Sequence, residues 1–185
     1  EAQDPNLAAI SLDGEPTLYP KLDGLIEEFQ NRNITPFLVT NGQHPESLEK
    51  IRDPAQLYIS VVAPDKETYI KTCNPMNTNP WERLNESLEL MNSFSSVNVL
   101  RLTLVKGLNL KNPSGYARLI DKANPDFVEP KGYVAVGHSR ERLGMKYMPT
   151  YNEIKEFAEK IAGRTSYIIE DGFEPSRVVL LGKES

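Results

Sequence analysis

Short apolar runs alternate with helix-like patterns along the whole chain. The first run, residues 7–12, is almost continuously apolar and leads into a Gly-Glu-Pro turn at residues 14–16. Such a run is typical of a buried parallel strand that enters a loop. Apolar residues then recur at three- and four-residue spacing, at Leu22, Leu25, Ile26 and Phe29. This spacing predicts a helix with one core-facing stripe.

The same strand–helix unit repeats to the end of the chain. Further strands are expected at residues 36–40, 56–62, 97–105, 127–136, 166–169 and 177–181, the fourth of these broken at Pro130 and Gly132. Helices are expected at residues 45–51, 66–71, 81–91 and 114–122, and around residues 154–161. Regular alternation predicts right-handed crossovers and a parallel sheet in one α/β domain over residues 1–185. Doubly wound sheets and β/α barrels share this pattern, and both carry function at the carboxyl ends of their strands.

Composition narrows the possible functions. The 185 residues carry 26 acidic and 21 basic side chains, a net charge of −5, so any site for nucleic acid must be local. One cysteine, Cys73, excludes an internal disulfide and a thiolate-held metal cluster within this chain, and it favours a cytoplasmic, reducing setting. The longest apolar runs fall far short of the roughly 20 residues that cross a bilayer. The glycine patterns of dinucleotide and P-loop sites are absent.

Polar residues lie at the predicted carboxyl ends of the first three strands. In the turn after the first strand, Gly14 permits close backbone approach, Pro16 stiffens the chain, and Glu15 can hold an ammonium group. The alternative is an ordinary turn with a solvated carboxylate. Asn41 belongs to a common turn pair after the second strand. On the third strand, Ser60 either bonds the backbone or faces the mouth of a barrel.

Charged residues on the fourth and fifth strands indicate a functional site more strongly than the turn residues do. Arg101 stands in an apolar strand and therefore requires an anionic partner, which is Glu15, Glu129 or a ligand carboxylate. Glu129 and Lys131 alternate along the fifth strand and so share a face. Beside apolar walls, Lys131 can serve as a Schiff-base nucleophile or a base, and the alternative is a surface ion pair.

Residues 137–142 are expected to form a flexible, locally basic loop that suits phosphate contacts. His138 in this loop has no second ligand at helical spacing, so we assign it no metal. Cys73 has no companion thiol and is expected to be an ordinary cysteine.

Five segments together resemble one known family. They are S-L-D-G-E-P-T-L-Y-P (residues 11–20), F-L-V-T-N-G (37–42), Q-L-Y-I-S-V-V-A-P-D (56–65), L-R-L-T-L-V-K-G (100–107) and F-V-E-P-K-G-Y-V-A-V-G-H-S-R-E-R-L (127–143). Over nearly its whole length the chain resembles the archaeal radical S-adenosylmethionine enzymes that make 4-demethylwyosine in tRNA, a step of wybutosine synthesis. The last segment is the most specific, and residues from about 127 to 185 match the wyosine-forming part of the family.

This resemblance implies a partial, TIM-like β/α barrel of six parallel strands. In the family, an electron donor reduces a [4Fe–4S] cluster. The cluster then reduces S-adenosyl-L-methionine to a radical. The radical drives a lyase-type condensation of pyruvate with N1-methylguanosine beside the anticodon of phenylalanine tRNA. The resemblance implies no membrane partner.

The resemblance also implies roles for single residues. Those for S-adenosylmethionine are Gly14, Glu15 and Pro16, at the methionine ammonium, and Asn41, Ser60 and Arg101, at the ribose and carboxylate. Lys131, with Glu129 beside it, is the candidate that holds pyruvate as a Schiff base. The candidates for tRNA phosphate or a substrate carboxylate are Tyr133, Ser139, Arg140 and Arg142.

One family feature is absent from the sequence. The family carries a C-x-x-x-C-x-x-C loop after its first barrel strand, where three thiolates hold the cluster, whereas this chain opens at what would be the second strand. We therefore expect a fragment without the first βα unit, rather than a relic that has lost the radical activity. The chain as given is expected to have no metal ligands, to hold no cluster, to be inactive alone and to bind the cofactor weakly. Two rival hypotheses are a noncatalytic tRNA-binding module that uses residues 138–146 and a metal-free lysine aldolase of barrel type.

Overall fold

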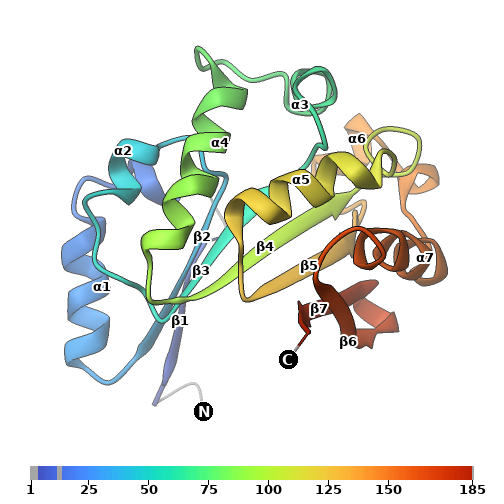
Figure 1. Cartoon of the computed structure of the whole chain (residues 1–185). Helices are drawn as coiled ribbons and strands as arrows, with labels where there is room; N and C mark the ends of the chain where they lie inside the picture. The colour runs from blue at the N-terminus through green and yellow to red at the C-terminus, as the bar shows by residue number, and fades with distance from the viewer. Residues whose placement is uncertain (1–3, 12–13, 185) are drawn as a thin grey trace.

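The computed structural model describes residues 4–11 and 14–184, and one seven-stranded sheet runs through them (Figure 1). The strand order is β1-β2-β3-β4-β5-β7-β6, and β1 to β5 are parallel. The strands are β1 (Leu7–Ile10), β2 (Thr35–Thr40), β3 (Gln56–Val61), β4 (Val97–Leu104), β5 (Phe127–Gly132), β6 (Tyr167–Phe173) and β7 (Val178–Lys183). Part of the predicted first strand, residue 12, lies outside the described residues. Five parallel strands in chain order are the expected partial β/α arrangement.

Several helices begin at capping residues or prolines that the sequence supplies. Asp65 accepts a hydrogen bond from the Thr68 amide at the start of α3, and Thr150 and Glu153 form a reciprocal capping box at the start of α7. Proline occupies the first turn of α2, α4 and α5. The helices are α1 (Leu22–Asn31), α2 (Pro45–Leu48), α3 (Lys66–Cys73), α4 (Pro80–Leu90), α5 (Pro113–Ala123), α6 (Ser139–Arg142) and α7 (Tyr151–Ala162). None of the helices in the described part of the chain is long and apolar enough to span a bilayer.

The end of the chain departs from the prediction of an all-parallel sheet. β6 and β7 form an antiparallel hairpin, and β7 pairs with β5 in the antiparallel sense. The two strands are joined by a single short turn, Glu174–Ser176, which is far too short for a parallel crossover. Glu170 and Asp171 lie in β6 at an irregularity of its pairing with β7.

The fifth strand is continuous, although a break was predicted at its proline and glycine. β5 includes both Pro130 and Gly132. Proline lacks an amide donor, but the described pairs between β5 and β7 skip Glu129 and Pro130, so no ladder bond to β7 is lost there. The predicted strand residues 133–136 lie beyond the end of β5.

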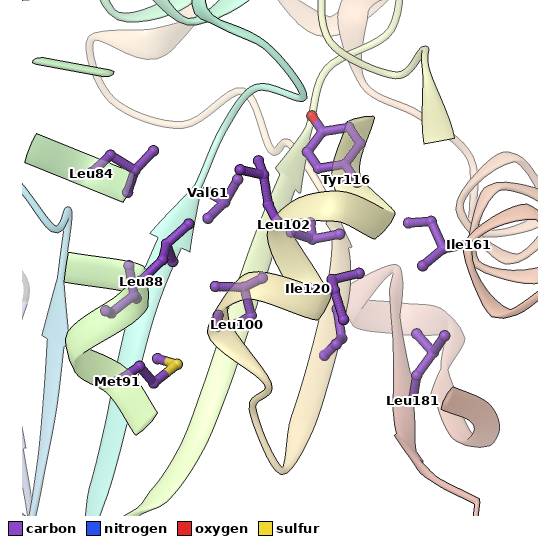
Figure 2. Packing of buried hydrophobic residues seen from close by; sticks show 14 of the residues in the cluster. Val61, Leu84, Leu88, Met91, Leu100, Leu102, Tyr116, Ile120, Ile161 and Leu181 are labelled. Carbon is purple, nitrogen blue, oxygen red and sulfur yellow. The ribbon is translucent and has the colours of Figure 1, made fainter. Parts of the chain in front are cut away.

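The two faces of the sheet differ in burial. One face carries the core and is covered by helices α1, α4, α5 and α7 (Figure 1). Figure 2 shows side chains of this core from the strands and the helices, including Val61, Leu100 and Leu102 of the sheet, Leu84 and Leu88 of α4, Met91 just after α4, and Ile120 of α5. On the other face the alternate residues are only partly buried. We call this second face the open face and define it by Tyr58, Ser60, Arg101, Thr103, Glu129 and Lys131.

Candidate functional site

The strand register gathers the predicted site residues of the open face into rows. Ser60 of β3 pairs with Arg101 of β4, which pairs with Glu129 of β5. One step closer to the carboxyl ends, Thr103 pairs with Lys131. Paired residues of neighbouring strands project to the same face. The open face therefore presents a serine, an arginine, a glutamate and a lysine in two adjacent rows.

Arg101 finds one of the three partners that the sequence allowed. Its Nε donates to Oε2 of Glu129 at 2.7 Å, and its guanidinium carbon lies 4.6 Å from the ring centroid of Tyr58. The two charged side chains are 27% and 17% exposed, so the pair is well shielded from water. Burial raises the pKa of Tyr58, with a further rise from Glu129 that Arg101 opposes. The cluster fixes the guanidinium between an acid and an aromatic ring.

Glu15 forms a hydrogen-bonded corner between the ends of β1 and β2. Its Oε1 accepts hydrogen bonds from the Thr17 amide at 3.2 Å, the Thr17 hydroxyl at 2.7 Å and the Thr40 hydroxyl at 2.5 Å. Its Oε2 accepts one, from the Asn41 amide at 2.9 Å. Oε2 accepts only this one hydrogen bond among the described residues, so this oxygen can also accept from a cationic group.

The backbone around this corner explains its sequence. Gly14 has φ +86°, a left-handed conformation that glycine adopts without strain. Pro16 is the first residue of the 3-10 turn Pro16–Leu18, where its missing amide costs nothing and Glu15 caps the turn. Both alternatives for Glu15 thus have support, because the carboxylate closes the turn and still has acceptor capacity.

Asn41 and Ser60 line a shared pocket of about 310 Å³ beside α3, with Gln43, Tyr69 and Cys73 among its other walls. The Asn41 side chain accepts the Gln43 amide hydrogen at 2.9 Å. The Gln43 side chain donates to Tyr69 Oη and to the Pro80 carbonyl, each at 2.9 Å. Its Oε1 is buried and has no partner among the described residues. A buried acceptor without a donor beside a pocket fits a ligand that brings a donor.

A second pocket of about 360 Å³ lies between the ends of β3 and β4 and residues 133–143. Its walls include Thr103, Val105, Tyr133, Ser139 and Arg142. Three of the four predicted RNA- or substrate-binding residues therefore meet at one cavity. The fourth, Arg140, is absent from this lining, and its Nε donates to the Ala135 carbonyl at 2.8 Å.

The segment predicted as a flexible loop contains the short helix α6. Tyr133 Oη donates to the Ser139 carbonyl at 2.8 Å, and the Ser139 hydroxyl donates to the Val136 carbonyl at 2.6 Å. These bonds fold the segment against the end of β5. Tyr133 and Ser139 thus have a structural task, and the Arg142 guanidinium makes no hydrogen bond within the described part of the chain.

The lone cysteine lies where both pockets meet. Cys73 lines each of them. Burial raises the pKa of its thiol, against smaller opposing effects of the Tyr69 hydroxyl and Arg142. The described residues contain no group of three metal-ligating side chains, and an iron–sulfur cluster needs several thiolates. The residues of this chain therefore do not fit a cluster, whereas the Glu15 corner and the Gln43 pocket fit a polar ligand such as S-adenosylmethionine.

Two residues of the site were missed by the sequence analysis. Tyr58 alternates with Ser60 along β3, and this period-2 pattern would have placed it on the open face beside Arg101. Asn109 is fully buried and ties the ends of two strands together. Its side chain accepts the Val105 amide hydrogen and donates to the carbonyls of Val62 and Thr103 at 2.7 and 2.9 Å. A polar residue between two leucines was the only signal for it.

Comparisons with known proteins agree with this geometry. The family model for the radical SAM superfamily matches residues 7–120, and that for wyosine base formation matches residues 122–183. An S-adenosyl-L-methionine-dependent tRNA 4-demethylwyosine synthase of Pyrococcus abyssi is 50% identical over 189 residues, which cover 100% of this chain and 55% of the relative. The corresponding enzyme of Methanocaldococcus jannaschii is 38% identical, over 100% of this chain and 58% of the relative. The chain thus spans a little over half the length of these curated relatives.

A solved structure described as TYW1 with a lysine–pyruvate adduct bound superimposes with a TM-score of 0.90. It is 36% identical in sequence, and the match covers 98% of this chain and 58% of that chain. The predicted partial β/α barrel is thereby confirmed. Because the superfamily model matches more than half of the chain, the chain belongs to the radical SAM superfamily.

Proposed function

We propose that the chain is the cofactor- and substrate-binding part of a tRNA 4-demethylwyosine synthase, which joins pyruvate to N1-methylguanosine in phenylalanine tRNA. The observation that supports this proposal most is Lys131. It is partly buried on the open face, and no ion pair or hydrogen bond of its amine is found within residues 4–11 and 14–184. The similar solved structure contains a lysine–pyruvate adduct. A lysine without a carboxylate partner is available for such an adduct.

The Arg101–Glu129 pair explains how Lys131 stays free. Glu129 lies two residues before Lys131 on the same face and would be its natural ion-pair partner, but its Oε2 accepts from Arg101 at 2.7 Å. With this acid engaged, the Lys131 amine can attack the ketone carbon of pyruvate. A carbon–nitrogen bond forms, the carbonyl oxygen leaves as water, and an imine remains. Glu129 is thus a positioning residue in this proposal.

The amino-terminal strand ends are proposed to bind S-adenosylmethionine. Glu15 Oε2 would accept the methionine ammonium, and the Asn41–Ser60 pocket would take the ribose. Arg101 would contact the carboxylate with the guanidinium nitrogens that Glu129 leaves unbonded. When bound, this cofactor supplies the carbon-centred radical of the superfamily. Because the chain does not fit a cluster, the cluster and the electron donor must be supplied by other parts of the protein or by partners.

Arg140 and Arg142, next to Tyr133 and Ser139, are proposed to face the RNA. Both arginines are exposed, and Arg142 also lines the pocket at the end of β4. Phosphate contacts require local positive charge, which this segment supplies in a chain of net charge −5. An RNA substrate and a lone, partly buried thiol fit a reducing, cytoplasmic setting.

Borohydride trapping tests the proposal on the chain as it stands. Incubation with pyruvate and borohydride should add one reduced pyruvyl group, detected by intact mass, and Lys131→Gln should abolish the adduct. Lys106→Gln is the matched control, because this lysine follows β4 but pairs with Glu153 at 2.6 Å. Absence of an adduct in the wild type, or an adduct that survives Lys131→Gln, would contradict the role of Lys131.

A further inference from the structure

One large aromatic side chain on the sheet is exposed to solvent. Phe173 is the last residue of β6, and it is 59% exposed. Most other large aromatic residues of the sheet lie in the core or in partly buried rows of the open face, as Tyr167 and Tyr58 do. A phenylalanine at the end of a well-paired strand gains little stability while it faces water. Its position therefore invites a partner.

The strand register places Phe173 in the row of Lys131. Phe173 pairs with Val178 of β7, Val178 pairs with Lys131 of β5, and Lys131 pairs with Thr103 of β4. Directly paired residues project to the same face, in antiparallel and in parallel ladders alike. Phe173 is thus on the open face, two strands away from the amine that the proposed function assigns to pyruvate.

The spacing of this row leaves room for a nucleobase. Neighbouring strands lie about 4.8 Å apart, so the Phe173 and Lys131 positions are separated by about 10 Å. Stacked bases repeat at about 3.4 Å, so a base between two groups needs about 7 Å. Val178, the residue between them, is shorter than either neighbour and is partly buried. A planar base fits above Val178, with the phenyl ring on one side and the Lys131 side chain on the other.

The backbone holds this ring in place. The turn after Phe173 ends at Arg177, which has φ +48°, and every other described non-glycine residue with positive φ is an asparagine. The carbonyl of Arg177 accepts the amide hydrogen of Gly132 at 2.8 Å, one residue after Lys131. The strained turn is thereby fastened to β5. Phe173 is part of a rigid element rather than a loose tip, as a stacking platform requires.

We propose that Phe173 is the stacking platform for the purine base of N1-methylguanosine, which it holds beside Lys131. The inference rests on the proposed function, because that function supplies the ligand. Aromatic side chains bind unpaired bases by stacking. The N1-methyl group occupies the position of a pairing hydrogen, so the base is not held in a Watson–Crick pair and can enter the row.

The test measures binding of the 185-residue chain to an anticodon stem-loop of phenylalanine tRNA that carries N1-methylguanosine. Phe173→Ala should weaken binding about 5- to 150-fold, the range of one stacked base. Phe173→Tyr should bind as tightly as the wild type. Phe173→Leu, whose side chain is apolar but not planar, should bind as weakly as Phe173→Ala. Ile168→Ala is the matched control, because Ile168 is on the same strand, is 45% exposed and lies in the far row of Gly182 and Phe127.

The salt dependence of binding separates stacking from phosphate contacts. Phe173→Ala should leave the salt slope unchanged, whereas Arg142→Glu should reduce it. The inference would be overturned if the wild type binds and Phe173→Ala binds equally well, or if Phe173→Leu binds as tightly as the wild type. Either result would leave the proposed function standing. Equal losses in Phe173→Ala and Ile168→Ala would overturn it too. A wild-type chain that does not bind the stem-loop would overturn the proposed function itself.

Discussion

The Glu15 corner follows β1 and Lys131 lies on β5, the two outer strands of the parallel part of the sheet, and the two places are built in opposite ways. Glu15 accepts four hydrogen bonds, from Thr17 of its own turn, from Thr40 of β2 and from Asn41 just after β2. Lys131 has no polar partner in the described part of the chain, although Glu129 is only two residues away. A group with a structural task must be paired at all times, whereas a group that forms a bond with substrate must be free. The difference teaches that substitutions at Glu15 should mainly reduce folding stability, whereas substitutions at Lys131 should mainly prevent formation of the pyruvate adduct.

The largest effect on stability is expected at the Glu15 corner. Glu15→Ala should reduce the free energy of unfolding by about 2–3 kcal/mol, because it removes a cap and leaves the buried Thr17 and Thr40 hydroxyls without their acceptor. Urea unfolding would measure the change. Glu28→Ala is the control, since its surface pair with Arg32 should contribute no more than about 0.5 kcal/mol. Equal losses in the two variants would show that the corner is not structural.

An intermediate effect is expected at the Arg101–Glu129 pair. Glu129→Gln should reduce stability by about 1 kcal/mol, because Arg101 loses its charged partner in a shielded place. The same change should lower the pKa of Tyr58 toward its ordinary value, since burial and the Glu129 charge both raise it now. Absorbance titration of the tyrosinate follows this shift. An unchanged Tyr58 pKa would contradict the contact geometry of the cluster.

A smaller, pH-dependent effect should mark the paired lysine that contrasts with Lys131. Hydrogen bonds from Lys106 and from the Thr150 amide hold the pKa of Glu153 below its ordinary value. A depressed carboxyl stabilises the fold above its unfolded pKa, and this contribution is lost as pH falls through the folded pKa. Glu153→Gln should therefore lower the free energy of unfolding at pH 7 by a few tenths of a kcal/mol, and by less at pH 3. An equal decrease at both pH values would contradict this ionic contribution.

The smallest effect on stability is expected at Lys131 itself. Lys131→Gln should change the free energy of unfolding by no more than about 0.5 kcal/mol, because the amine has no partner to lose among the described residues. The same urea measurement as for Glu15→Ala gives the comparison directly. A decrease in the free energy of unfolding near that of Glu15→Ala would mean that Lys131 is a structural residue. The proposed contrast between Glu15 and Lys131 would then be wrong.

Much of the fold could be predicted from hydrophobic periodicity, because each βα unit carries its own local pattern. The strands β1 to β4 and the long helices follow the predicted ranges to within a few residues, whereas β5 is unbroken and ends at Gly132. The terminal hairpin did not follow from periodicity, since a strand pattern does not specify the direction of pairing. The short connection at Glu174–Ser176 would have predicted it, because so few residues can join two neighbouring strands only in the antiparallel sense.

The candidate site was predictable as a set of residues but not as a set of contacts. Arg101 required an acid, and only the register of β4 and β5 selects Glu129 over Glu15. Phe173 stands between a glycine and a glutamate near a turn, where nothing in the sequence shows that its row contains Lys131. Which residues share a row depends on the pairing of strands that are far apart in the sequence, and only the structure shows this pairing.

The most direct test of the central claim is product formation in a completed enzyme. The part of the Pyrococcus abyssi relative that this chain does not match would be joined to this chain, and the joined protein would be reconstituted anaerobically with iron and sulfide. Cleavage of S-adenosylmethionine would confirm that the joined protein is assembled. We predict 4-demethylwyosine in tRNA that carries N1-methylguanosine, and none with Lys131→Gln. Cleavage without this product, or product that persists in Lys131→Gln, would contradict the account.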